Sequence, residues 1–268
     1  MSEIKLYNHV FRLVLSGLLL GWFIKLKVFF WNYLNVITFK YPVSFSQFPA
    51  LFESPATAQL MYFLPVMTLP AVFLKGENIS IIYHKICCIC LIFASLFMML
   101  HSATYNDATF VTSFWVSLWL LWFTFHFESK YYKDACKLAM AVVCFIFLGG
   151  LTGKLSSEWW SGEVMFGITQ STFKHWPFTW IKNNTTYEEL KTFSMVLSWG
   201  IIFLEAAIVS SFFWPLRFSL KIIPALIAGI IFFRTWLILS VISCLILLLT
   251  GCYLLYKNIP ADRNGETD

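Results

Sequence analysis

The residues most able to do chemistry surround one lysine in a chain that carries few charges. Lys154 follows a glycine-rich helix end, residues 147–153, and precedes Glu158 and the tandem tryptophans Trp159 and Trp160. Apolar and aromatic walls disfavour the ammonium form of a lysine, which makes its amine available as a general base. We therefore take Lys154 as the candidate catalytic residue, with Glu158, Trp159 and Trp160 lining a substrate site. The alternative is a membrane anchor, because lysines extend toward lipid headgroups and tryptophans collect at membrane interfaces.

A second candidate is Glu205, which lies inside the apolar run that begins at Trp199. An ionisable side chain at membrane depth costs free energy unless it is paired, protonated or hydrated. Arg234, in another apolar stretch, is the expected countercharge, and Lys154 is the other available cation. We expect Trp199, Glu205 and Arg234 to shape the substrate site. A purely structural ion pair, or a protonated glutamate bonded to a neighbouring helix, is the alternative.

The elements that hold these residues are predicted to be membrane helices. The chain has 268 residues, of which 59% are hydrophobic, 19% aromatic and only 12% charged. Several apolar runs reach the roughly 20 residues that a helix needs to cross a bilayer, and none alternates as barrel strands do. We predict an all-α integral membrane protein in contact with lipids. The net charge of +5 comes from single cations at helix ends, which gives no support to nucleic-acid binding.

The expected bundle contains about eight transmembrane helices in a single domain, residues 1–268. Residues 218–256 are too long for one crossing and therefore count as two. Lys25 and Lys27 are expected to end the first helix, and Pro65 and Pro70 to kink the second. The predicted spans are residues 8–24, 59–74, 81–100, 110–127, 136–150, 193–214 and the two within 218–256.

The segment 152–190 is predicted to fold as an aromatic cap outside the cytoplasm, because a disordered segment would not carry so many aromatic residues. Residues 259–268 are expected to form a disordered tail. The first helix lacks a small-residue cleavage site, so we expect it to be retained. Lysines and arginines cluster on the side of the N-terminus, which predicts that both termini are cytoplasmic, in a bacterial inner membrane.

Two further patterns are interpreted as structural. Cys87 and Cys90 form a C-x-x-C pair, but without a thioredoxin-like context they are typical of small core residues. His101, His126 and Asp107 lack the spacing that metal ligands need, so no metal is expected.

Two longer motifs contain these candidate residues. The first is Phe147-Leu-Gly-Gly-Leu-Thr-Gly-Lys154-Leu-Ser-Ser-Glu-Trp159-Trp-Ser-Gly162-Glu-Val-Met165. The second is Trp199-Gly-Ile-Ile-Phe-Leu-Glu205, followed by Phe212-Phe213 and Arg217. Both motifs resemble segments of the vitamin K-dependent γ-glutamyl carboxylases and occur in that family's order, and the resemblance extends from about residue 141 to 256. The chain thus looks like a single-domain member of the wider horizontally transferred transmembrane (HTTM) domain family.

This resemblance implies that Lys154 is the base that deprotonates a vitamin K-like hydroquinone, so that the cofactor would be a reduced quinone. The chain departs from the family in three places. Arg234 stands where many members have a histidine, Tyr105-Asn106-Asp107 replaces a histidine-bearing turn, and the sequence stops at Asp268 without the family's propeptide-binding domain. We therefore expect a lyase-like carboxylase or quinol epoxidase that acts on a lipid-soluble hydroquinone or a small membrane-presented peptide.

A non-enzymatic function stays open beside this one. Single-domain relatives serve peptide maturation, so the protein could be a membrane subunit for the maturation, immunity or assembly of a secreted partner. A Gly-Lys-Leu feature like that at residues 153–155 also occurs in DoxX-like and MauE-like redox partners.

Overall fold

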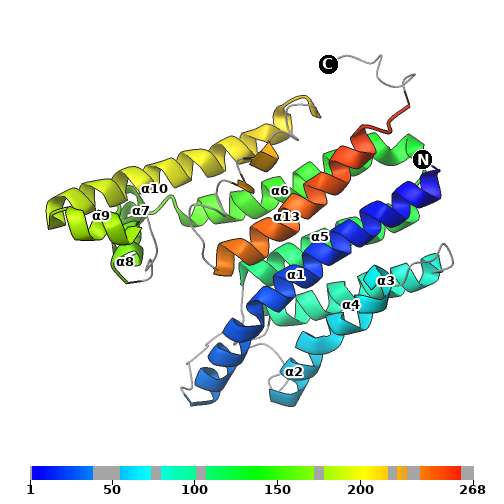
Figure 1. Ribbon diagram of the computed structural model, residues 1–268, viewed down its shortest axis with the longest axis horizontal. Coiled ribbons are helices and arrows are strands. Elements are labelled where there is room, and N and C mark those ends of the chain that lie inside the picture. The colour runs from blue at the N-terminus through cyan, green and yellow to red at the C-terminus, as the bar shows by residue number, and fades with distance from the viewer. Residues whose placement is uncertain are drawn as a thin grey trace. The chain divides into compact units, whose positions relative to one another are not determined.

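The computed structural model describes residues 2–38, 55–73, 80–100, 107–171, 178–216, 222–224, 226–227 and 236–260, with backbone alone at 27–38, 55, 171 and 236–238. Every element within these ranges is a helix (Figure 1). Seven described segments are long and apolar enough to cross a membrane, which confirms the prediction of an all-α membrane protein. They are Glu3–Leu26, Ala56–Phe73, Ile81–Leu100, Ala108–Phe125, Ser129–Gly153, Tyr187–Phe213 and Leu239–Tyr256.

The first helix, α1 (Glu3–Thr38), is much longer than predicted. Its 36 residues extend for about 54 Å, well beyond the roughly 30 Å of a hydrocarbon core. The prediction that Lys25 ends this helix is wrong. The Lys25 side chain does not extend to water, because it is buried in an ion pair with Asp107, and the helix continues past it.

The second predicted span is broken where its prolines stand. It consists of α2 (Pro55–Phe63), the 3₁₀ helix η1 (Leu64–Thr68) and α3 (Leu69–Phe73). Pro65 lies in the first turn of η1, where a missing backbone N–H removes no helical hydrogen bond. The kink expected at the prolines is therefore present as a change of helix type.

The next helices begin and end close to their predicted limits. They are α4 (Ile81–Leu100), α5 (Ala108–Phe125), the short η3 (Ser129–Tyr131) and α6 (Tyr132–Gly153). Asp107 starts α5, because its carboxylate accepts the backbone N–H of Thr109 at 2.8 Å. The last helix is α13 (Trp236–Tyr256). It covers the second of the two spans predicted within residues 218–256, and most of the first lies outside the described residues.

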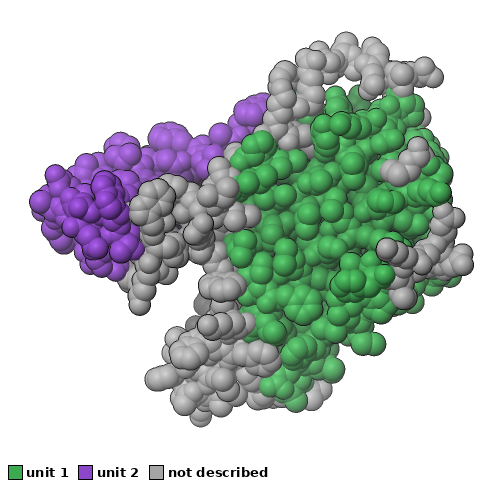
Figure 2. Space-filling model, in the orientation of Figure 1, with its two compact units in different colours: residues 1–142, 215–268 green, residues 143–214 purple. Residues whose placement is uncertain are grey.

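The helices form two compact units, shown in Figure 2. Unit 1 comprises residues 1–142 and 215–268, and its core is built from α1, α4, α5 and α13. Helices α1 and α13 pack closely because glycines face the partner helix. A Cβ at Gly17 would lie 3.0 Å from Leu247 Cβ, and one at Gly251 would lie 3.2 Å from Val10 Cγ1. These pairs make the two helices antiparallel, so the start of α1 and the end of α13 lie at the same end of unit 1 (Figure 1).

Unit 2 comprises residues 143–214 and contains the last turns of α6. Three short helices follow, namely α7 (Ser157–Trp160), α8 (Glu163–Ser171) and α9 (Phe178–Asn184). The long α10 (Tyr187–Ser210) and η4 (Ser211–Phe213) complete the unit. The predicted cap segment thus consists of short helices joined by turns where it is described, and residues 172–177 within it lie outside the described ranges. The expected tail also lies outside them from residue 261 onward.

Candidate functional site

The first candidate site lies in unit 2, where Lys154 follows the last residue of α6. Its backbone N–H donates to Leu151 O at 2.9 Å, which tightens the final turn. Its ammonium turns back along the helix, donating to Gly150 O at 3.1 Å and lying 2.9 Å from Glu205 Oε1. An anchoring lysine would extend away from the helix end, so this geometry is that of an internal ion pair.

Gly150 provides the space in which the two charged groups meet. A Cβ at this position would lie 3.4 Å from Lys154 Nζ and 3.5 Å from Glu205 Oε2. At Gly149 and Gly153 a Cβ would meet nothing within 4 Å. Of these three glycines, Gly150 alone adjoins the pair.

The ion pair is mostly shielded from solvent within unit 2. The Lys154 and Glu205 side chains are 19% and 15% exposed. Glu205 Oε1 contacts the lysine, whereas Oε2 is buried and has no hydrogen-bond partner among the described residues. A buried carboxylate oxygen without a partner costs free energy, and a hydrogen-bond donor placed beside it removes that cost. The pair can therefore receive a hydroxyl or amide group at Oε2.

Trp159 forms one wall of the site, with its ring centroid 5.3 Å from Lys154 Nζ. This is within the range of a cation–π contact. Helix α7 is fixed against α10 by two hydrogen bonds, in which Ser198 donates to Trp159 O and Trp199 Nε1 donates to Trp160 O at 2.9 Å. The position of the Trp159 ring therefore depends on the packing of α7 against α10.

The turn between α7 and α8 requires a glycine. Gly162 has φ +79°, a left-handed conformation that residues with a side chain rarely adopt. A Cβ there would also lie 2.5 Å from Met195 Cα on α10. Gly162 thus permits the close approach of the α7–α8 turn to α10.

The other predicted site residues lie in different surroundings. Trp160 and Trp199 are 40% and 38% exposed and are joined to each other through the Trp160 carbonyl. Glu158 is exposed at the start of α7, where its own backbone N–H and the hydroxyls of Ser156 and Ser157 hold the pKa of its carboxyl below the ordinary value. Arg234 lies outside the described residues, so its pairing with Glu205 stays a prediction. The partner that the structure gives Glu205 is Lys154.

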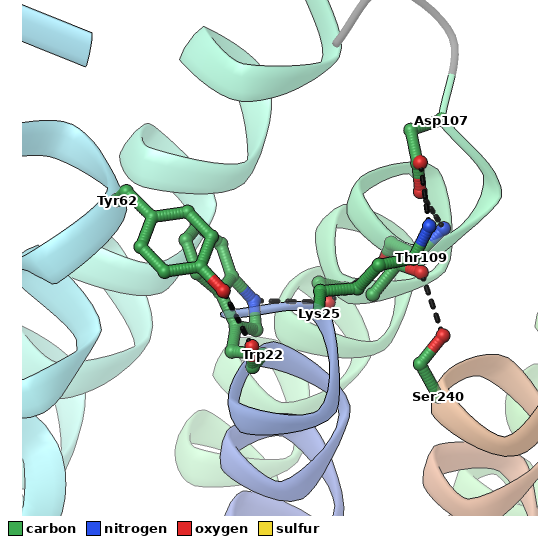
Figure 3. Close-up of polar contacts among 7 residues, drawn as sticks. Trp22, Lys25, Tyr62, Asp107, Thr109 and Ser240 are labelled. Atoms are coloured by element: carbon green, nitrogen blue, oxygen red, sulfur yellow. Dashed lines mark hydrogen bonds and ion pairs between the residues drawn. The ribbon is translucent and has the colours of Figure 1, made fainter. Parts of the chain in front are cut away.

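A second polar cluster, in unit 1, was missed as a site by sequence reasoning (Figure 3). Lys25 Nζ lies 2.7 Å from Asp107 Oδ2, and the lysine is only 5% exposed. Nearby, Thr109 and Ser240 share a hydrogen bond of 2.8 Å between their hydroxyls. Trp22 Nε1 donates to the Ser113 hydroxyl at 3.1 Å. The sequence feature that could have indicated this cluster is Asp107, because an aspartate directly before an apolar helical run is typical of a helix N-cap.

Metal-ligating and redox patterns add no further site in the described part of the chain. No group of three or more histidine, cysteine, aspartate or glutamate side chains lies close enough there to hold a metal ion. Cys87 and Cys90 are free thiols on α4.

Comparison with known proteins finds no match for this chain among protein-family models, curated proteins or solved structures. The proposals below rest on the geometry of the two polar sites and on the two sequence motifs.

Proposed function

We propose that this protein is a carboxylase-like membrane protein that takes a proton from a lipid-soluble hydroquinone, or acts on a small membrane-presented peptide, at the Lys154–Glu205 pair. One observation carries the proposal: the pair is shielded and closely spaced, yet one carboxylate oxygen has no partner among the described residues. A phenolic hydroxyl is a donor of the kind that this oxygen favours. The Trp159 ring offers an aromatic wall beside it.

The proton balance of the pair is compatible with a base function. An ammonium paired with a carboxylate cannot itself accept a proton. Transfer of the Lys154 proton to Glu205 would neutralise both groups, which a poorly solvated setting favours. The free amine of Lys154 could then take a proton from the ligand. The step ends with a charged lysine, a neutral glutamate and a deprotonated ligand held beside the ammonium.

A reduced quinone fits the residues present, and it would supply the oxygen chemistry that the side chains lack. Glu205 would accept a hydrogen bond from the hydroxyl of the hydroquinone, and Lys154 would stabilise the negative charge that develops on that oxygen. Trp159 would orient the ring of the hydroquinone. In this proposal Gly150 keeps room for the ligand next to the pair.

We also propose eight crossings, with both termini in the cytoplasm of a bacterial inner membrane. The start of α1 and the end of α13 lie at one end of unit 1 (Figure 1), which supports an even number of crossings. The described residues contain seven candidate spans. The stretch between Phe213 and Trp236 is long enough for one more membrane crossing if it is helical, at 1.5 Å per residue. The helical cap α7–α9 would then lie on the outer side.

The test of the base function is turnover by purified protein in nanodiscs. Hydroquinone consumption under oxygen should be abolished by Lys154→Arg, because arginine keeps the charge but does not release its proton. Glu205→Gln should also reduce it strongly. The matched control is the exposed pair Lys130–Glu128, in which Lys130→Arg and Glu128→Gln should leave turnover unchanged.

A fully active Lys154→Arg protein would contradict the base function. The remaining proposal would then be a non-catalytic membrane subunit for a secreted partner, or a redox partner of the DoxX-like or MauE-like kind. In such a protein Lys154 needs only to carry a positive charge at its position in the membrane, and arginine carries the same charge.

A further inference from the structure

We infer that unit 1 contains a path for protons along the buried face of α5. It is separate from the Lys154–Glu205 site and does not rest on the function proposed for that site. The path joins the Lys25–Asp107 pair, near the start of α5, to the Tyr7–His84 pair, near its end.

The buried face of α5 carries hydroxyl groups over its first half and again near its end. Five side chains on this helix are hydroxylic and at most 2% exposed. They recur at the three- and four-residue spacing that places side chains on one face of a helix. The five are Thr109, Thr112, Ser113, Ser117 and Thr124.

Some of these hydroxyls are satisfied by their own helix and others are not. Ser113 and Thr124 each donate to the carbonyl four residues earlier, at 2.8 Å. Thr112 and Ser117 have buried hydroxyls without a hydrogen-bond partner among the described residues, and so does Ser95 on α4. Buried hydroxyls of this kind favour small polar partners such as ordered water. They are therefore positions at which water that enters the bundle would find hydrogen-bond partners.

Ser95 provides one of these positions from the opposite helix. Its neighbours on α4, Ala94 and Met98, belong to one buried cluster with Phe110 of α5 and Trp22 of α1. Ser95 is therefore at the level of the first turns of α5, where Thr112 lies. The unpartnered hydroxyls of Ser95 and Thr112 thus lie at a similar level of the bundle, in the half of unit 1 nearest Asp107.

Proton-exchanging groups stand at both ends of α5. At one end Lys25 and Asp107 form the ion pair of Figure 3. At the other, Tyr7 OH and His84 Nδ1 are 2.9 Å apart, and the Tyr7 ring lies 5.6 Å from that of Phe123. His84 is 1% exposed, and its Nε2 has no hydrogen-bond partner in the described ranges. Buried ionisable groups in membrane proteins characteristically mark proton relays.

The dimensions suit a transmembrane path with one interruption. From Asp107 to Thr124, α5 rises by about 26 Å, close to the thickness of the hydrocarbon core. Between Ser117 and Thr124 the buried face is apolar, with Leu120 and Phe123 fully buried. This gap of about 10 Å must take up water before a proton crosses. We therefore expect slow flux, with protons passed from group to group and no net chemical change.

The test uses the full-length protein in liposomes with an entrapped pH-sensitive dye. A potassium gradient with valinomycin supplies the driving voltage. Wild-type protein should acidify the lumen faster than protein-free liposomes do. Ser117→Ala and His84→Gln should each lower the protein-dependent rate about tenfold, because each removes a proton-carrying group.

Two controls make the result specific. Ser243→Ala removes a hydroxyl that is already used within α13, where it donates to Leu239 O, and it should leave the rate unchanged. Lys154→Arg should also leave it unchanged, which separates this inference from the proposed base function. Ser117→Ala should keep the wild-type melting temperature or raise it, because the hydroxyl it removes has no partner among the described residues. Wild-type flux no faster than that of empty liposomes would overturn the inference, as would wild-type rates in both path variants.

Discussion

The Lys154–Glu205 pair should make a measurable contribution to the free energy of unfolding, because both side chains are mostly buried. Glu205→Ala leaves a lysine that is desolvated and unpaired. We expect it to destabilise the protein by about 3 kcal/mol, at the lower end of values for broken buried pairs because the site is partly exposed. Lys154→Met combined with Glu205→Ala should recover part of this loss.

The measurement is a double-mutant cycle by thermal or chemical unfolding in detergent. The exposed pair Lys130–Glu128 is the control, and its Glu128→Ala variant should change stability little. If the effects of the two substitutions at Lys154 and Glu205 simply add, the two side chains do not interact in solution.

Sequence reasoning selected Lys154 and Glu205 separately but could not join them. An ionisable group in an apolar run is visible without a structure, because its desolvation cost depends on local context. Which cation neutralises it depends on which helices are neighbours, and spacing along the chain carries no such information. The sequence favoured Arg234 as the countercharge, with Lys154 as the other available cation. The packing of α10 against the end of α6 is what brings Lys154 to Glu205.

At the scale of elements, Asp107 has two separable tasks. It caps α5 through Oδ1 and neutralises Lys25 through Oδ2. Asp107→Asn keeps a good cap but loses the charge, whereas Asp107→Ala loses both. We expect both variants to be destabilised, the alanine variant by about 1 kcal/mol more, since that is the typical value of an N-cap. Unfolding midpoints in detergent measure the difference, and equal stabilities would show that the cap contributes nothing.

The turn at Gly162 gives a sharper prediction about how elements pack. Gly162→Ala introduces a Cβ at a left-handed φ and within 2.5 Å of the α10 backbone. We expect a loss of at least about 2 kcal/mol, since strain and steric overlap both act. Trp159 should also lose its fixed position, which its fluorescence would report.

Gly167→Ala is the matched control, because it lies inside α8 with nothing within 4 Å of the added Cβ. Alanine should raise helix stability there by about 0.5 to 1 kcal/mol. A Gly162→Ala protein as stable as wild type would mean that α7 and α8 do not rest on α10 as described.

Helix limits were predictable where a local signal exists. Apolar run length placed α4 and α5 within a few residues, because a span must match the bilayer. Helix α10 begins earlier than predicted, at Tyr187, since Thr186 and Glu189 form a capping box that extends it through a polar turn. The length of α1 was not predictable from Lys25, because the aspartate that buries this lysine is 82 residues away.

At the scale of the whole molecule, the membrane topology is open to direct test. Reporter fusions at the C-terminus and in the connection at residues 126–130 should both report the cytoplasmic side. The structure places Ser129 against Glu3, with the Ser129 N–H donating to the glutamate at 2.9 Å. A reporter inserted just before Asp107 should report the opposite side. A C-terminus outside the cytoplasm would contradict the proposed cytoplasmic location of both termini, and a C-terminus on the opposite side from residues 126–130 would contradict an even number of crossings.

The pairing of α1 with α13 has a consequence for biosynthesis. Helix α1 leaves the ribosome well before α13, the helix against which it packs closely through Gly17 and Gly251. Translation proceeds at roughly 5 to 20 residues per second, so α1 waits on the order of ten seconds or more before its partner exists. Until α13 is synthesised, the glycine-bearing face of α1 can contact only lipid or the helices that lie between α1 and α13 in the chain. The contact between α1 and α13 therefore forms only after α13 has been synthesised. A nascent chain halted before α13 would leave the glycine-bearing face of α1 without its partner helix.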